Sequence, residues 1–178
     1  MVFSGAVFMH NGYIALLLTD NGMTDSAFSG LASTCFMAGG LLAGVLLAEA
    51  MRRAGRALVP VCMLTGGICL GAISLAPAPW MILALSFVLG LSFSLTMPAM
   101  VSRLSAGLRG EHLVITCALF QGLNSIAQFF SERIFALVRA VPAMDSMNGE
   151  FRVAALVLVF GGAITAAVLH RKPEFWKS

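Results

Sequence analysis

Charged residues are absent from long stretches of this sequence, and this segregation constrains the fold more than any motif does. Only 11% of the residues are charged and 59% are hydrophobic, whereas about a quarter of the residues in a soluble domain are charged. The composition therefore excludes a soluble globular domain and indicates an all-α integral membrane protein. Runs of 18 or more residues without Lys, Arg, Asp or Glu cover positions 1–19, 26–48, 57–102, 112–131 and 153–170.

The longest uncharged run, 57–102, is divided by Ala76-Pro77-Ala78-Pro79. Two prolines this close together end a helix and favour an exposed turn. Since about 20 apolar residues span a bilayer, the runs predict six transmembrane helices followed by a short tail, 171–178. The helices are expected near 2–19, 27–50, 57–76, 80–102, 112–137 and 151–170.

The basic residues indicate how the chain is oriented in the membrane. Eight of the eleven Lys and Arg residues lie after the second and fourth expected helices and in the tail. The other connections are acidic, uncharged or mixed, and the connection 138–150 has Arg139 with Asp145 and Glu150. Because basic connections remain in the cytoplasm, both termini are expected to be cytoplasmic. We expect a multi-pass protein of the plasma membrane, such as a bacterial inner membrane, with the lipid bilayer around it and no nucleic-acid partner.

The sequence contains no motif for a cofactor, a metal site or an enzyme. Its four cysteines all lie inside expected spans, without a CxxC pair or a histidine at ligand spacing, and are interpreted as packing residues. A six-helix intramembrane serine protease of the rhomboid kind would need Ser92 and His170 as a pair. However, Gly90-Leu91-Ser92-Phe93 lacks the second glycine of G-x-S-G, and the pair would lie about 15 Å apart along the membrane normal. We therefore expect neither enzymatic activity nor a cofactor.

An arginine-rich segment follows the second expected helix, Ala48-Glu49-Ala50-Met51-Arg52-Arg53-Ala54-Gly55-Arg56. It is similar to the cytoplasmic loop pattern G-x-x-x-D-R-x-G-R of the major facilitator superfamily. Arg53, Gly55 and Arg56 match this pattern, whereas its first glycine and its aspartate are absent. Glu49 is the acidic side chain that can substitute for that aspartate. In the family, the charges of this loop interact with neighbouring helix ends and help to hold one conformational state.

The order of helices and loops resembles the C-terminal six-helix half of such a transporter over essentially the whole chain. Gly90 with Pro98, and Gly122-x-Asn124, are similar to positions in the tenth and eleventh helices of the family. The resemblance implies transport of an unidentified small solute by alternating access, together with an N-terminal six-helix half or a second copy of this chain. The alternative is a truncated or split half with no transport activity alone.

Amide side chains form a row on the fifth expected helix. Gln121, Asn124 and Gln128 lie at i, i+3 and i+7, and Ser131 continues the row. Because polar side chains in a span must face protein or water, these amides are candidates to line a substrate cavity. They equally suit hydrogen bonds between helices, and the sequence leaves both interpretations open.

The first expected helix carries His10-Asn11-Gly12-Tyr13 near its middle. The segment resembles the seventh helix of the family, which implies cavity positions for Asn11 and Tyr13. His10 invites a proton-coupling hypothesis, although a neutral histidine bonded to a neighbouring helix is the simpler expectation. Gly12 and Pro98 are candidate positions for a bend or kink during gating.

No Asp or Glu is expected near the centre of a span. If transport is coupled to protons, the carboxylate that carries them therefore belongs to the other half of the transporter. Otherwise, His10 has to carry the proton.

Overall fold

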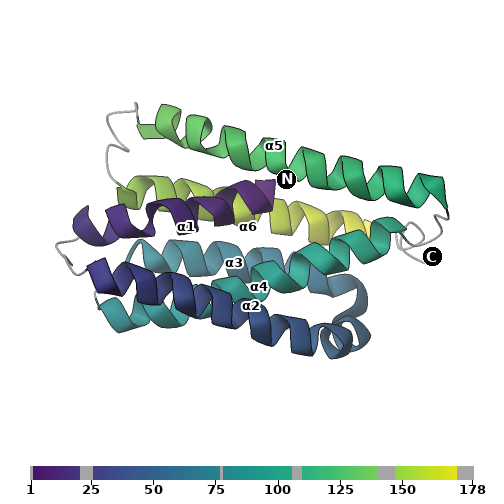
Figure 1. Ribbon diagram of the computed structural model, residues 1–178, viewed down its shortest axis with the longest axis horizontal. Helices are drawn as coiled ribbons and strands as arrows, with labels where there is room; N and C mark the ends of the chain where they lie inside the picture. The colour runs from purple at the N-terminus through teal and green to yellow at the C-terminus, as the bar shows by residue number, and fades with distance from the viewer. Residues whose placement is uncertain (1, 21–25, 77, 106–109, 140–146, 172–178) are drawn as a thin grey trace.

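The computed structural model describes residues 2–20, 26–76, 78–105, 110–139 and 147–171, and every regular element in these ranges is a helix (Figure 1). Each of the six expected ranges contains one α-helix, with ends displaced by at most four residues. In chain order the elements are α1 (Val2–Asp20), α2 (Ser26–Ala54), η1 (Gly55–Ala57), α3 (Leu58–Ile73), α4 (Pro79–Ser105), α5 (Glu111–Arg139) and α6 (Met147–Arg171).

Local chemistry explains several of the helix ends. Gly55, between α2 and α3, has a φ angle of 47°, and Gly110, just before α5, has a φ angle of 61°. Positive φ angles favour glycine, which has no Cβ atom. Pro79 opens α4, where its missing N–H costs no helical hydrogen bond. The charge pattern placed Glu150 in a connection, but α6 already begins at Met147 and Glu150 lies in its first turn.

Four of the described helices, α2, α4, α5 and α6, are long and apolar enough to cross a membrane by length and composition. Shorter apolar stretches occur in α1 (Ser4–Leu18) and α3 (Leu58–Ile73). The 16 residues of α3 extend about 24 Å, compared with a hydrocarbon core of about 30 Å. The structure thus shows an all-helical chain with long apolar helices, as in a membrane-embedded protein, and six complete spans remain a prediction.

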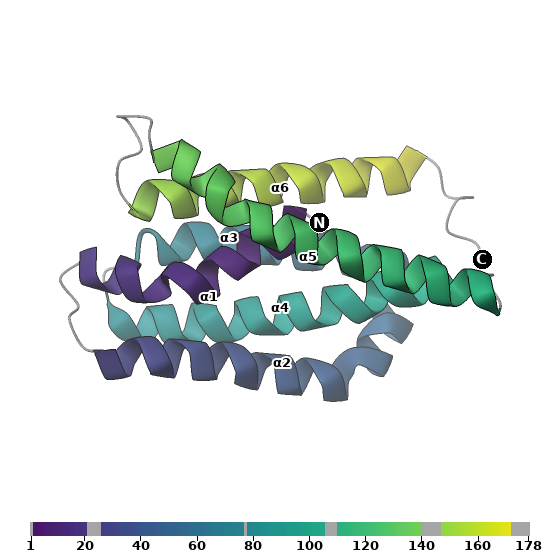
Figure 2. The same cartoon turned by 45° about the horizontal axis from the view of Figure 1, so that its top comes forward.

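The long axes of the helices lie roughly parallel in one bundle (Figures 1 and 2). The most extensive contacts join α2 to α4, α3 to α6 and α3 to α4. Next come the contacts of α1 with α5 and with α6. α5 lies at the edge of the bundle, and the first residues of α1 lie about midway along it (Figure 1). α1 therefore accompanies only the second half of α5.

The helix contacts obey a simple exchange rule. Let α1, α2 and α3 exchange places with α4, α5 and α6, respectively. The pair α2–α4 then becomes α5–α1, the pair α3–α4 becomes α6–α1, and the pair α3–α6 is unchanged. All of these pairs are among the most extensive interhelix contacts. α1 and α4 run in opposite directions along the bundle (Figure 1), so the exchange also reverses the direction of the first helix of each group.

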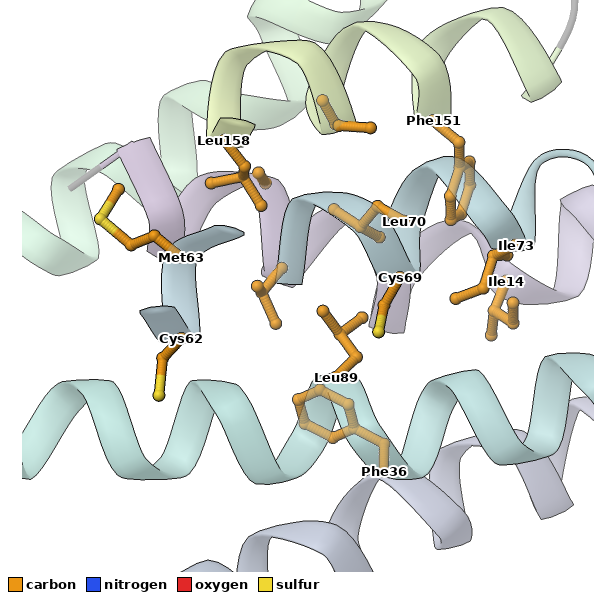
Figure 3. Packing of buried hydrophobic residues seen from close by; sticks show 14 of the residues in the cluster. Ile14, Phe36, Cys62, Met63, Cys69, Leu70, Ile73, Leu89, Phe151 and Leu158 are labelled. Carbon is orange, nitrogen blue, oxygen red and sulfur yellow. The ribbon is translucent and has the colours of Figure 1, made fainter. Parts of the chain in front are cut away.

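A cluster of buried apolar side chains fills the centre of the bundle (Figure 3). Most of its side chains belong to α1, α3, α4 and α6, and Phe36 joins them from α2. In lipid such packing stabilises by close van der Waals contact, because removal from lipid gives little hydrophobic gain. The largest fully buried apolar side chains are Phe151, Ile14, Leu17, Leu18, Leu70, Ile73, Ile82, Leu89 and Leu158.

Two glycines allow the backbones of α2 and α4 to touch. A Cβ atom on Gly39 would overlap the main-chain oxygen of Phe87, and one on Gly90 would overlap that of Phe36. Backbone atoms cannot move aside as the end of a flexible side chain can. The α2–α4 contact therefore requires glycine at both positions.

The contact between α3 and α6 is nearly as close. A Cβ on Gly67 would lie 3.1 Å from the main-chain oxygen of Ala155, and one on Gly162 would lie 3.2 Å from the main-chain nitrogen of Leu64. Small residues at helix contacts are typical of membrane bundles. The helices α2, α3, α4 and α6 thus form the closely packed part of the structure.

We predict that Gly39→Ala and Gly90→Ala each lower the free energy of unfolding by about 1–3 kcal/mol, because the added methyl group forces the backbones of α2 and α4 apart. Equilibrium unfolding of the purified protein in mixed micelles, followed by circular dichroism, measures this change. Gly44→Ala on α2 is the matched control, since a Cβ there meets nothing within 4 Å. Gly44→Ala should leave stability unchanged or raise it by up to about 1 kcal/mol. Equal effects of Gly90→Ala and Gly44→Ala would contradict the backbone contact.

Candidate functional site

The amide row of α5 lies at the contact between α5 and α1. The Gln128 side chain donates a hydrogen bond to the Ser4 hydroxyl at 2.7 Å. A Cβ on Gly5 would lie 3.2 Å from the Cβ of Ser131, so the helices also approach closely there. Asn124 and Ser131 are buried, Gln128 is half-buried, and Gln121 is exposed. At Gln128 the row therefore joins two helices by a hydrogen bond.

A polar row on α1 meets the row on α5. Asn11 is seven residues after Ser4, so the two residues share one face of the helix. Asn11 is exposed, and a Cβ atom added to the neighbouring Gly12 would meet nothing within 4 Å. Beyond the contact with Gln128, the polar row thus continues along α1 on an open surface.

We define the polar seam as the side chains of Gln121, Asn124, Gln128, Ser4 and Asn11. Seven residues of helix are about 10 Å long, both from Gln121 to Gln128 and from Ser4 to Asn11. α1 and α5 run in the same direction, so the two stretches add to about 20 Å of a hydrocarbon core of about 30 Å (Figure 1). The seam is uncharged, and both of its ends are exposed.

Asn124 has an unsatisfied polar atom. Its side chain is 6% exposed, and its Oδ1 atom has no hydrogen-bond partner among the described residues. A buried acceptor without a partner costs about 1–3 kcal/mol. The seam therefore contains an acceptor that a hydrogen-bond donor from a solute, from water or from a partner chain would satisfy.

The central residues of α1 have three different surroundings. His10 is completely buried, Asn11 is exposed, and Tyr13 is half-buried and packs against the buried apolar cluster. Successive helical residues point about 100° apart, which accounts for this divergence. Of these residues, only Asn11 belongs to the seam.

His10, on α1, packs against aromatic side chains of α2 and α6. Its ring centroid is 5.7 Å from that of Phe36 and 6.4 Å from that of Phe151. Neither ring nitrogen has a hydrogen-bond partner among the described residues. The expected hydrogen bond from His10 to a neighbouring helix is therefore absent from the described part of the structure.

Glu150 is a buried ionisable residue that the sequence pattern did not reveal. It is 0% exposed in the first turn of α6. Ala154 and Leu158 lie on the buried apolar face of α6. Glu150 lies on the same face, because it precedes Ala154 by one helical turn. The charge pattern placed Glu150 in the connection 138–150, whereas the structure buries it at the start of α6, and extending the apolar period would have found it.

At the other end of the bundle, the Glu49 carboxylate pairs with two arginines of its own helix. One oxygen lies 2.7 Å from Arg52, and the other pairs with Arg53. Hydrogen bonds from both arginines favour the ionised carboxylate. The pairing thus stays within α2, where the loop pattern of the family had suggested contact with neighbouring helices.

A contact between helices at this end comes from Arg103, which no sequence motif singled out. Its guanidinium donates a hydrogen bond from α4 to the main-chain carbonyl of Gly55. The Gly55 carbonyl also accepts the backbone N–H of Leu58 at the end of η1, so Arg103 adds a second donor from another helix. The side chain of Arg56 and the residues 172–178 of the predicted tail lie outside the described part of the chain.

Two hydroxyl groups on α4 are satisfied within the helix, as expected for serine and threonine in an apolar helix. Thr96 donates to the carbonyl of Ser92 at 2.7 Å, and Ser86 donates to that of Ile82 at 2.7 Å. Ser92 is buried in the bundle, and the side chain of its hypothetical partner His170 is not among those described. Pro98 lies inside α4 with an exposed side chain.

The four cysteines are free thiols, with Cys62 and Cys69 buried. Within the described ranges, no three His, Cys, Asp or Glu side chains gather as a metal site would require. No family model, no curated protein and no solved structure matches the chain. Any assignment of function therefore depends on the geometry of the bundle.

A double-mutant cycle of Ser4→Ala and Gln128→Leu should give a coupling energy of about 0.6–1.7 kcal/mol, between the average and the maximum measured for interhelical hydrogen bonds in a membrane protein. Equilibrium unfolding of the two single variants and the double variant in mixed micelles measures this coupling. Pairing Ser4→Ala with Ser125→Ala provides the control, because Ser125 is exposed on α5. A coupling for Ser4 and Gln128 no larger than that of the control pair would show that the bond does not join α1 to α5.

Proposed function

We propose that this chain is one six-helix half of a secondary transporter of the major facilitator type, which moves a small solute across the membrane by alternating access. The observation that carries the proposal is the exchange relation between α1–α3 and α4–α6. Inverted repeats of three helices are nested within each half of these transporters. Neither helix length nor composition requires such a relation, so it supports the resemblance independently of the loop pattern.

The basic residues support a defined orientation. Arg52 and Arg53 lie at the end of α2, and Arg103 bonds to the same end of the bundle from α4. By the positive-inside rule this end is cytoplasmic, which puts the connection after α1 on the outer side. We assign the chain to the plasma membrane on this basis.

The polar seam supports a second bundle as partner. Asn11 and Gln121 expose amides within helices whose other exposed residues are mainly apolar, and lipid cannot hydrogen-bond to them. An N-terminal six-helix half or a second copy of this chain would remove the seam from lipid. The space between the two bundles would then be the solute path.

The chemistry of the seam favours a solute without net charge. Its side chains are three glutamine or asparagine amides on α5, one further amide on α1 and the hydroxyl of Ser4, which offer donors and acceptors in similar numbers. Among the described residues no ionised side chain belongs to the seam. A split half without transport activity alone is the alternative, and it differs from the proposal in lacking a water-filled path.

Thiol labelling tests for that path. In a background without the native cysteines, Asn11→Cys and Gln121→Cys in membrane vesicles should react with a membrane-impermeant maleimide about tenfold faster than thiols that face lipid, because only a hydrated thiol ionises. Met37→Cys and Val45→Cys on α2 are the controls. Met37 and Val45 are 67% and 80% exposed, respectively. Their distances in residues from the nearer end of α2 are similar to the distances of Asn11 and Gln121 from the nearer ends of α1 and α5, so all four thiols would lie at similar depths.

Equal rates at all four positions would show that the seam faces lipid or is sealed, and would contradict a cavity at α1 and α5. Labelling at Asn11→Cys and Gln121→Cys from opposite sides of the membrane would support alternating access. Labelling of both positions from one side alone would support a static vestibule and contradict transport by this chain.

A further inference from the structure

His10 is the buried polar side chain that the polar seam does not include. It is 0% exposed, and its neighbours are the rings of Phe36 from α2 and Phe151 from α6. A neutral imidazole has one N–H donor and one acceptor nitrogen. Both nitrogens lack a partner among the described residues, so the site holds a polar ring in surroundings that satisfy neither of its polar atoms.

The helix that carries His10 is the one most able to leave this arrangement. The contact between α1 and α2 is much less extensive than the contact between α4 and α2. The contact between α1 and α6 is likewise less extensive than that between α3 and α6. The glycine contacts that bring backbones together join α2 to α4 and α3 to α6. A small displacement of α1 would therefore hydrate the imidazole and leave the rest of the bundle packed.

Hydration of the ring makes its protonation favourable. The rings of Phe36 and Phe151 carry no counter-charge for an imidazolium, whereas water solvates it. In water an imidazole takes up a proton near pH 6.5. The packed arrangement of α1 thus excludes the proton, and the displaced arrangement accepts it.

We propose that His10 is a proton-operated switch for α1: the neutral ring keeps α1 packed between Phe36 and Phe151, and reversible protonation releases α1 from α2 and α6. The step is the binding of one proton to a ring nitrogen, and no other bond changes. The switch rests on the water-filled path of the proposed function, because lipid cannot hydrate the imidazole, and its readout is separate from the labelling of that path. In a transporter it would couple proton binding to movement of the helix that carries Asn11.

Other ionisable groups near the site come from each neighbouring helix. Glu150 and Arg152 flank Phe151 on α6, Cys35 precedes Phe36 on α2, and α3 carries Cys69. Between Pro79 and Met100, α4 has no ionisable side chain. Among the described side chains, Glu150 is an ionisable group with 0% exposure, as His10 is, so the test has to separate His10 from Glu150.

The chain has one tyrosine, Tyr13, three residues from His10 on α1, which provides a single reporter. Incorporation of 3-fluorotyrosine into the chain in lipid nanodiscs gives one fluorine resonance for this helix. As the pH falls from 7 to 5, we expect a second resonance to appear, from the displaced α1. The ratio of its population to that of the first resonance should rise by up to about tenfold per pH unit, which is the limit when one proton is bound.

His10→Phe should abolish the second resonance, because phenylalanine fills the space and cannot bind a proton. Should that variant fail to fold, His10→Gln serves the same purpose with a polar side chain that does not titrate. Glu150→Gln and His112→Asn should retain the pH dependence, since His112 is exposed at the start of α5.

The absence of any pH-dependent population in the unmodified chain would overturn the proposal. A pH dependence that disappears in Glu150→Gln but persists in His10→Gln would also overturn it, and would assign the effect to the carboxyl group. These results leave the transport proposal untouched, because the labelling of Asn11→Cys and Gln121→Cys is measured separately.

Discussion

Lipid offers no hydrogen bonds, so each polar group within this bundle must be satisfied by the chain, by water or by a partner. Several hydroxyl groups meet this constraint inside their own helices. Ser86, Thr96 and Thr165 each donate to the carbonyl four residues earlier. The amides and the imidazole cannot do so. Most of those in the described helices belong to α1 and α5, and Asn148 lies in the first turn of α6. This division decides which helices provide the scaffold and which provide the site.

The scaffold depends on glycine. Gly39 and Gly90 allow α2 to meet α4, and Gly67 and Gly162 allow α3 to meet α6. α3 also packs against α4, so these four helices hold together without α1 and α5. α1 and α5 are joined by the Ser4–Gln128 hydrogen bond, and each exposes an amide within an apolar stretch, Asn11 and Gln121. A conformational change would accordingly move α1 and α5 against a fixed scaffold.

The helix ranges follow from the sequence because charge and proline mark them directly. Segregated charges delimit the helices, and Ala76-Pro77-Ala78-Pro79 divides the longest uncharged run. The amide row on α5 is equally visible, because it follows from helical spacing alone. Contacts between helices are different. With 18 glycines in the chain, spacing could not select Gly39 and Gly90, since the choice depends on which backbone lies opposite. The burial of Glu150 was missed because a charge was taken as the mark of a connection.

The roles of His10 and Asn11 could not be separated from the sequence for the same reason. Neighbours on one helix differ by about 100° in direction, and only the positions of α2, α5 and α6 determine that His10 is enclosed and Asn11 open. The exchange relation between the two groups of three helices is likewise a property of contacts, with no counterpart among the sequence motifs. It carries more weight for the proposed function than the partial loop pattern does.

The central claim is that the face formed by α1 and α5 is not a lipid-facing surface. A density map of the chain reconstituted in lipid, obtained by electron cryomicroscopy with a rigid fiducial, tests it most directly. The account predicts ordered acyl chains along the exposed apolar face of α2, and protein or water beside Asn11 and Gln121. Acyl chains packed along both of those amides would contradict the account.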